Sequence, residues 1–115
     1  MNLEFSKLPG DISFITLQGN LDIAGVGAAE TRFYAYCAGS PPRVLVDLSG
    51  VGFIASLGIR MVLQAIKTTA ARGGKLLLLN PASAVASALD ISGLGNFIHY
   101  GSPAEASVAL LNNLK

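Results

Sequence analysis

The sequence contains few of the residues that most often carry out chemistry in proteins. Among its 115 residues are one cysteine, one histidine and only 13% charged residues. A single cysteine, Cys37, excludes an internal disulfide and a cysteine-based metal cage. Because Cys37 lies in a helical pattern between Tyr36 and Ala38, we interpret it as a small packing residue and not as a reactive thiol. Spacing assigns no nucleophile to the lone histidine, His99, so we expect no transition-metal site, no cofactor and no catalysis.

Charge and the length of the apolar runs exclude two further classes of protein. The formal net charge is +1, and the eight basic residues are scattered, whereas nucleic-acid binders gather them into a stripe that neutralises phosphates. The longest apolar runs, residues 76–79 and 44–46, are far shorter than the roughly 20 apolar residues that span a bilayer. The first residues also lack the basic and apolar regions of a signal peptide. We therefore expect a cytoplasmic protein that neither binds nucleic acid nor inserts into a membrane.

Hydrophobic periodicity predicts a single α/β domain over residues 1–115. Residues 11–18 alternate apolar and polar side chains, and the turn signal before them predicts a hairpin with a short strand over residues 4–7. The apolar runs over residues 43–48 and 75–79 are typical of strands buried on both faces of a parallel sheet. The remaining predicted elements are helices over residues 23–38, 56–72, 82–90 and from 103 onward, and a strand over residues 97–100. This alternation predicts a mostly parallel central sheet, fed by the hairpin and covered by about four helices.

Capping and turn residues predict where these elements begin and end. Asp22 is expected to cap the first helix, because its carboxylate can accept hydrogen bonds from the free amides of the first turn. Ser56 is expected to cap the second helix in the same way, and residues 102–105 have the Ser-Pro-x-Glu layout of a capping box. Residues 19–20 are expected to end the second strand, and residues 39–42 to break the first helix.

Two segments carry most of the functional information. Residues 17–22, Leu-Gln-Gly-Asn-Leu-Asp, come at the end of a predicted strand. Residues 44–58 comprise a buried strand, a tight loop over residues 49–55 and the start of a helix at Ser56. Together they resemble the STAS family of sigma-factor antagonists and transporter regulatory domains. In that family an apolar strand leads to Gly-x-Leu-Asp, and a second one ends in Asp-Leu/Phe-Ser before a loop closing with Phe-hydrophobic-Asp-Ser-Ser-Gly.

The resemblance covers essentially the whole chain, because Ile91-Ser92-Gly93-Leu94 and the strand over residues 75–79 also fit the family's pattern. It implies an anti-sigma factor antagonist that acts by switching protein partners. In members of this kind, an anti-sigma kinase phosphorylates the first serine of the loop–helix junction, which is Ser56 in this sequence. The unphosphorylated form binds the serine-kinase-type anti-sigma factor and frees the sigma factor, the phosphorylated form releases it, and a phosphatase resets the cycle.

The expected partner surface runs from residues 19–28 across residues 53–58 onto the exposed side of the following helix. Its candidate contact residues are Leu21, Asp22, Ile54, Ala55, Ser56, Leu57, Gly58, Arg60 and Met61.

The junction departs from the family's pattern at two positions. Ala55 stands where the family has an aspartate, and Leu57 stands where it has a second serine. The first change removes a negative charge and a hydrogen-bond acceptor beside Ser56. Two interpretations of Ser56 therefore stay open: a phosphoacceptor, or a residue that only caps its helix.

Two other functions also stay open. A non-phosphorylated STAS scaffold, as a subunit of a stressosome-like or membrane lipid-transport complex, would fit the departures at the junction. A small nucleotide- or flavin-binding α/β domain is a more distant alternative, because Gly50-x-Gly52 lacks the third glycine and the acidic residue of a dinucleotide fingerprint. The apolar composition and an exposed strand edge are compatible with either a monomer or a weak homodimer.

Overall fold

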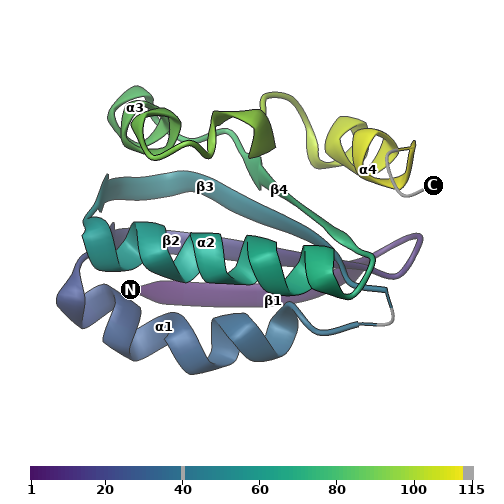
Figure 1. The fold of residues 1–115 in the computed structure, drawn as a ribbon, viewed down its shortest axis with the longest axis horizontal. Helices are drawn as coiled ribbons and strands as arrows, with labels where there is room; N and C mark the ends of the chain where they lie inside the picture. Colours follow the sequence, from purple (N-terminus) through teal and green to yellow (C-terminus); the bar gives the residue numbers. More distant parts are fainter. Residues whose placement is uncertain (40, 113–115) are drawn as a thin grey trace.

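The computed structural model describes residues 1–39 and 41–112, which form one five-stranded sheet and four α-helices (Figure 1). The strand order is β1-β2-β3-β4-β5. Strand β1 (Asn2–Leu8) pairs antiparallel with β2 (Ile12–Leu21). Strands β3 (Arg43–Ile54), β4 (Lys75–Leu79) and β5 (Ile98–His99) follow in parallel. The predicted α/β domain, in which a hairpin feeds a mostly parallel sheet, is confirmed.

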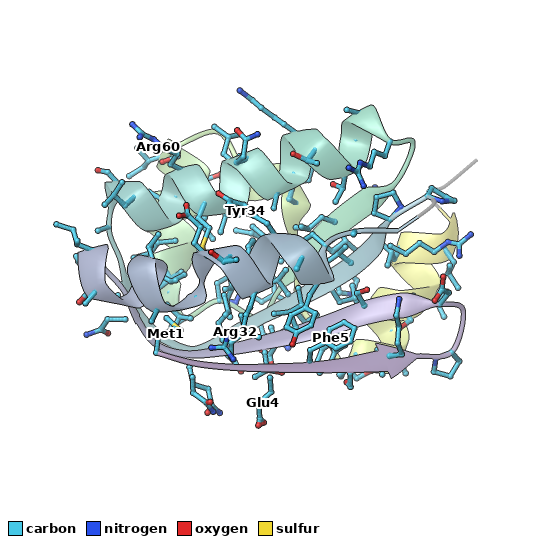
Figure 2. The ribbon with its side chains drawn as sticks, turned by 90° about the horizontal axis from the view of Figure 1, so that it is seen from below. Met1, Glu4, Phe5, Arg32, Tyr34 and Arg60 are labelled. Carbon is cyan, nitrogen blue, oxygen red and sulfur yellow. The ribbon has the colours of Figure 1, made fainter. Side chains whose placement is uncertain are left out.

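Helices cover both faces of the sheet. Helices α1 (Ile23–Tyr36) and α2 (Ser56–Ala71) lie side by side on one face, with α4 (Pro103–Asn112) behind the sheet (Figure 2). Helix α3 (Ser83–Ile91) packs against β3, and a 3-10 turn, η1 (Gly95–Phe97), connects it to β5.

The apolar runs of β3 and β4 are continuous because both faces of these strands are buried. Successive side chains of a strand point to opposite faces, so Val44 and Val46 enter one core while Leu45 enters the other. The larger core, under α1 and α2, includes Ile15, Leu17, Val44, Val46, Leu48, Phe33, Met61, Val62, Ala65, Leu76 and Leu78. The smaller core, under α4, consists of Ile12, Leu45, Leu77, Leu79, Ala106 and Leu110.

Strands β1, β2 and β3 are longer than predicted, whereas β5 is shorter than the predicted strand over residues 97–100. Strand β2 does not end at residues 19–20 but continues to Leu21, and residues 49–54 extend β3 instead of forming a loop. The two extensions pair with each other, since Gln18 lies opposite Gly50 and Leu21 opposite Ile54. Two register shifts interrupt this pairing, and Gly19 has a φ of +115° that favours glycine. Turn residues in the sequence do not predict these extensions. The backbone groups of each extension form their hydrogen bonds with the other strand, and the sequence does not show which strands pair.

The predicted helix ends are mostly confirmed. The carboxylate of Asp22 accepts a hydrogen bond from the Gly25 amide at 2.8 Å and caps α1. The capping box of α4 is complete, since the Ser102 amide donates to Glu105 at 2.8 Å and the Glu105 amide to the Ser102 hydroxyl at 3.1 Å. These hydrogen bonds lower the pKa of the Glu105 carboxyl. Helix α1 ends at Tyr36, before the break predicted over residues 39–42. Ser40, which belongs to that predicted break, lies outside the described residues.

Candidate functional site

The two motif segments meet at the edge of the sheet where β2 and β3 end. The Ala55 amide donates a hydrogen bond to the Leu21 carbonyl at 2.9 Å, directly after the last paired residues of the two strands. Helices α1 and α2 begin at this edge, after Asp22 and Ala55 respectively. Carboxyl ends of parallel strands are the usual place for binding sites in α/β domains. The last residues of the two motif segments, 19–22 and 52–58, which are far apart in the chain, therefore meet at one edge of the sheet.

Ser56 is the first residue of α2 and not its cap, which corrects the prediction. The N-cap is Ala55, in an extended conformation with φ −94° and ψ 175°, because its amide is bound to the end of β2. Its methyl group cannot accept a hydrogen bond, and the first turn of α2 holds no acidic residue. The first amides of α2 therefore receive neither a side-chain cap nor a compensating charge.

Four of the predicted contact residues are buried in the folded chain. Leu21, Ile54 and Met61 are core residues, with Met61 fully enclosed under α2. Gly58 is buried as well, and a Cβ at that position would lie 2.8 Å from Leu21 and from Ile54. These residues hold the start of α2 against the ends of β2 and β3. Contact of these four residues with a partner stays a prediction, and the structure places their side chains beneath the exposed part of the site.

The exposed part of the site surrounds Ser56. Ser56 and Arg60 are exposed, and Figure 2 shows Arg60 near the start of α2, pointing away from the sheet. Ile23, Phe53 and Leu57 are large hydrophobic residues with exposed fractions of 76%, 53% and 37%. Of these three, only Leu57 was singled out from the sequence. Phe53 lies between Gly52 and Ile54, and this local pattern does not show toward which face of the strand its side chain points. The pairing of β3 with β2 determines that the Phe53 side chain points outward.

Other polar residues near the strands have structural roles. The carboxylate of Asp47 accepts from the Ser49 amide at 2.9 Å, a short side-chain turn that lies within β3, next to a register shift in its pairing with β2. Cys37 is buried, and burial raises the pKa of its thiol to about 12. The thiol therefore stays protonated near neutral pH, and the packing role predicted for Cys37 is confirmed.

The described residues contain neither a metal-binding cluster nor a membrane-spanning helix. Within residues 1–39 and 41–112, no group of three or more His, Cys, Asp or Glu side chains could hold a metal ion. In the same part of the chain, no helix has the length and apolar character needed to cross a membrane. The site therefore consists of Ser56, exposed at the start of α2, and the apolar side chains of Ile23, Phe53 and Leu57, exposed at the same edge of the sheet.

Residues 6–109 match the STAS domain family, and the chain therefore belongs to this family. A curated relative, the anti-sigma F factor antagonist of Lysinibacillus sphaericus, is 27% identical over 96 residues, which cover 83% of this chain and 82% of the relative.

Solved structures share the fold. The unphosphorylated form of the anti-sigma factor antagonist SpoIIAA superposes with a TM-score of 0.81 at 22% identity, covering 96% of this chain and 97% of that one. An anti-sigma-factor antagonist (STAS) domain protein from Planctomyces limnophilus gives a TM-score of 0.82 at 20% identity, covering 95% and 97% of the two chains.

Proposed function

We propose that this chain is an anti-sigma factor antagonist that binds a serine-kinase-type anti-sigma factor through the surface around Ser56. The observation that carries the proposal is the exposed Ser56 hydroxyl at the junction of β3 and α2, with Ile23, Phe53 and Leu57 exposed at the same edge of the sheet. The likeness to the Lysinibacillus sphaericus antagonist supports the same role. In this role the chain is a cytoplasmic binding protein and not an enzyme.

The exposed apolar side chains explain why the surface would associate with another protein. Large hydrophobic residues that gather at one exposed edge are typical of protein–protein interfaces. Such residues contribute most of their binding free energy when a partner removes them from water. Asp22, which is half-buried and bound to the α1 amides, keeps the start of α1 in place beside them.

Phosphorylation of Ser56 is the proposed switch. A phosphate of about −2 charge would lie at the positive end of the α2 dipole. Arg60 is four residues further along the helix, on the same side as Ser56, and would pair with the phosphate. The same charge would oppose the burial of Phe53 and Leu57 against a partner. The folded chain would therefore tolerate the phosphate, while the complex would not.

Ala55 changes how the hydroxyl is prepared for phosphoryl transfer. The aspartate of the family's pattern would offer Ser56 a neighbouring acceptor, which a methyl group does not. The kinase must therefore orient the Ser56 hydroxyl with its own residues. Conversely, with alanine at residue 55, the phosphate is not repelled by the carboxylate that the family's pattern has directly before the serine.

The test is to purify the tagged chain from its native host and to analyse the co-purifying proteins and the intact mass together. We expect an anti-sigma factor of the kinase type and a fraction of the chain with one added phosphate. The added mass should vanish in Ser56→Ala and remain in Ser6→Ala, a control at an exposed serine of β1. An unmodified chain in a stable complex that lacks a kinase would contradict the switch. That result would favour a STAS scaffold with constant contacts.

A further inference from the structure

A second surface with its own chemistry lies between α3 and β5. It is a groove of about 430 Å³, to which α3 contributes Ser83, Ser87 and Asp90, while Ile98 and Tyr100 come from β5 and the residue after it. In Figure 1, β3 runs between α3 and α2, and buried residues of both helices belong to the larger core. The groove is therefore built from residues that the Ser56 surface does not use.

The polar side chains that line this groove are the hydroxyls of Ser83, Ser87 and Tyr100 and the carboxylate of Asp90. Asp90 is the only charged side chain that lines it. Within residues 1–39 and 41–112, the side chains of Ser83, Ser87, Asp90 and Tyr100 take part in none of the hydrogen bonds or ion pairs of the fold. Their bonding capacity is therefore open to a ligand that donates hydrogen bonds and carries positive charge.

Gly95 leaves room for the carboxylate of Asp90. A Cβ at position 95 would overlap with the Asp90 Oδ1 atom and lie 3.3 Å from its Cγ atom. The absence of a side chain at Gly95 thus lets the carboxylate rest directly against the backbone at one wall of the groove. A larger residue would force the carboxylate away from this position.

Exposed apolar surface adjoins the carboxylate. Ile91, the residue after Asp90, is 84% exposed, and the Tyr100 ring is 63% exposed. A tyrosine ring can stack with a planar cation, and an isoleucine this exposed can cover an apolar neighbour of that cation. Both features are typical of the places where proteins bind each other.

We infer that this groove binds an arginine side chain of a partner protein. A guanidinium is planar, always charged and carries five donors in a fork that matches a carboxylate. It can pair with Asp90, donate to the Ser83 and Ser87 hydroxyls and stack on Tyr100 at the same time. A lysine ammonium is a compact point charge and cannot stack in this way. The inference does not depend on Ser56 or on the identity of the anti-sigma factor.

The test is a titration of the ¹⁵N-labelled full chain with Nα-acetyl-arginine amide, followed by the backbone amide resonances. We expect weak but saturable shifts at Asp90, Gly95 and Tyr100. Asp90→Asn and Tyr100→Leu should each weaken the affinity by about threefold to fivefold, as the loss of an exposed ion pair or stacked ring does. Asp11→Asn makes the same charge change in the β1–β2 turn and should leave the affinity unchanged.

Two further measurements make the result decisive. Gly95→Ala should weaken binding as much as Asp90→Asn does, because the added methyl group moves the Asp90 carboxylate without removing it. The remaining amide resonances should still show a folded chain. Nα-acetyl-citrulline amide, which has the same shape without the charge, should cause no saturable shift. Shifts that fail to saturate, shifts that are equal for citrulline and arginine, or an arginine affinity that is unchanged in Asp90→Asn would each overturn the inference. Ser56→Ala should bind the arginine probe unchanged, so a failure here is separate from a failure of the proposed function.

Discussion

At the start of α2, the side chain of residue 55 decides how many backbone amides have an acceptor. Asp22 supplies one at the start of α1, whereas Ala55 supplies none at the start of α2. The two helices begin side by side, yet only one has a cap. Because of this difference, the first amides of α2 have no side-chain acceptor. They lie next to Ser56, the residue for which we propose phosphorylation.

Ala55→Asp should therefore stabilise the folded chain. A carboxylate at the N-cap accepts from the first-turn amides and interacts favourably with the helix dipole, which raises the free energy of unfolding by about 1 kcal/mol. Urea denaturation measures the change. Ala71→Asp adds the same charge at the opposite end of α2 and should lower the stability by roughly 0.3–1 kcal/mol. Equal effects of the two substitutions would show that α2 gains nothing from a cap at residue 55.

Burial of Cys37 predicts a dependence of stability on alkaline pH. The thiol has a pKa of about 12 in the folded chain and about 8.5 in an unfolded one, so folding favours its protonated form. The resulting stabilisation is complete below about pH 8.5 and is lost progressively as the pH rises above that value. Cys37→Ala should show a smaller loss of stability between pH 8 and pH 10 than the parent chain, measured by urea denaturation. A thiol that reacts at once with a disulfide reagent in the folded chain at pH 8 would contradict the burial.

Among the secondary-structure elements, α2 begins in close contact with the sheet. Its first turn touches the ends of β2 and β3 through Gly58, where a Cβ would meet Leu21 and Ile54 at 2.8 Å. Its last residue is Ala71, and Gly73, directly after the C-cap Arg72, has a φ of +76°, a conformation that favours glycine. Small residues thus permit the helix to reach the sheet and then to end.

Gly58→Ala should destabilise the fold by about 1–3 kcal/mol, because the added methyl group overfills this contact. Gly27→Ala is the matched control. Gly27 is also near the start of a helix, but its Cβ would point into open space among the described residues. That substitution should raise the free energy of unfolding by about 0.5–1 kcal/mol. Thermal or urea denaturation of both variants decides the prediction, which fails if the two changes have the same sign.

On the scale of the whole molecule, the apolar edge at Ser56 and the end of α4 lie at opposite ends of the sheet (Figure 1). Both ends expose hydrophobic residues, such as Leu57 at 37% and Val108 at 60%. Only the first end combines them with the STAS junction. Substitutions at the two ends therefore distinguish a specific partner surface from a general effect of exposed hydrophobic residues.

Leu57→Asp should weaken binding of the co-purified anti-sigma factor by roughly tenfold or more, because a charge replaces an apolar contact. The fold should not suffer, since a negative charge in the first turn of a helix is favourable. Val108→Asp at the other end should leave the affinity unchanged. Calorimetric titration of the partner with each variant gives the comparison, and equal losses in both would remove Leu57 from the interface.

The sequence by itself determined which segments are strands and helices and in what order they pack. Apolar alternation in residues 11–18 and the continuous runs of β3 and β4 indicated one half-buried and two fully buried strands, and local caps such as Asp22 and the capping box of α4 depend only on neighbours within a turn. The STAS motifs were visible for the same reason, because each is a short contiguous pattern.

Only the tertiary structure decided which side chains of the site face water. The extensions of β2 and β3 exist because each strand satisfies the backbone groups of the other, and this pairing shifted the cap of α2 from Ser56 to Ala55. It also turned Met61 and Gly58 inward and Phe53 outward. The groove between α3 and β5 likewise depends on Gly95 meeting Asp90. Contacts between residues distant in the chain set these directions, and no local pattern of residues contains them.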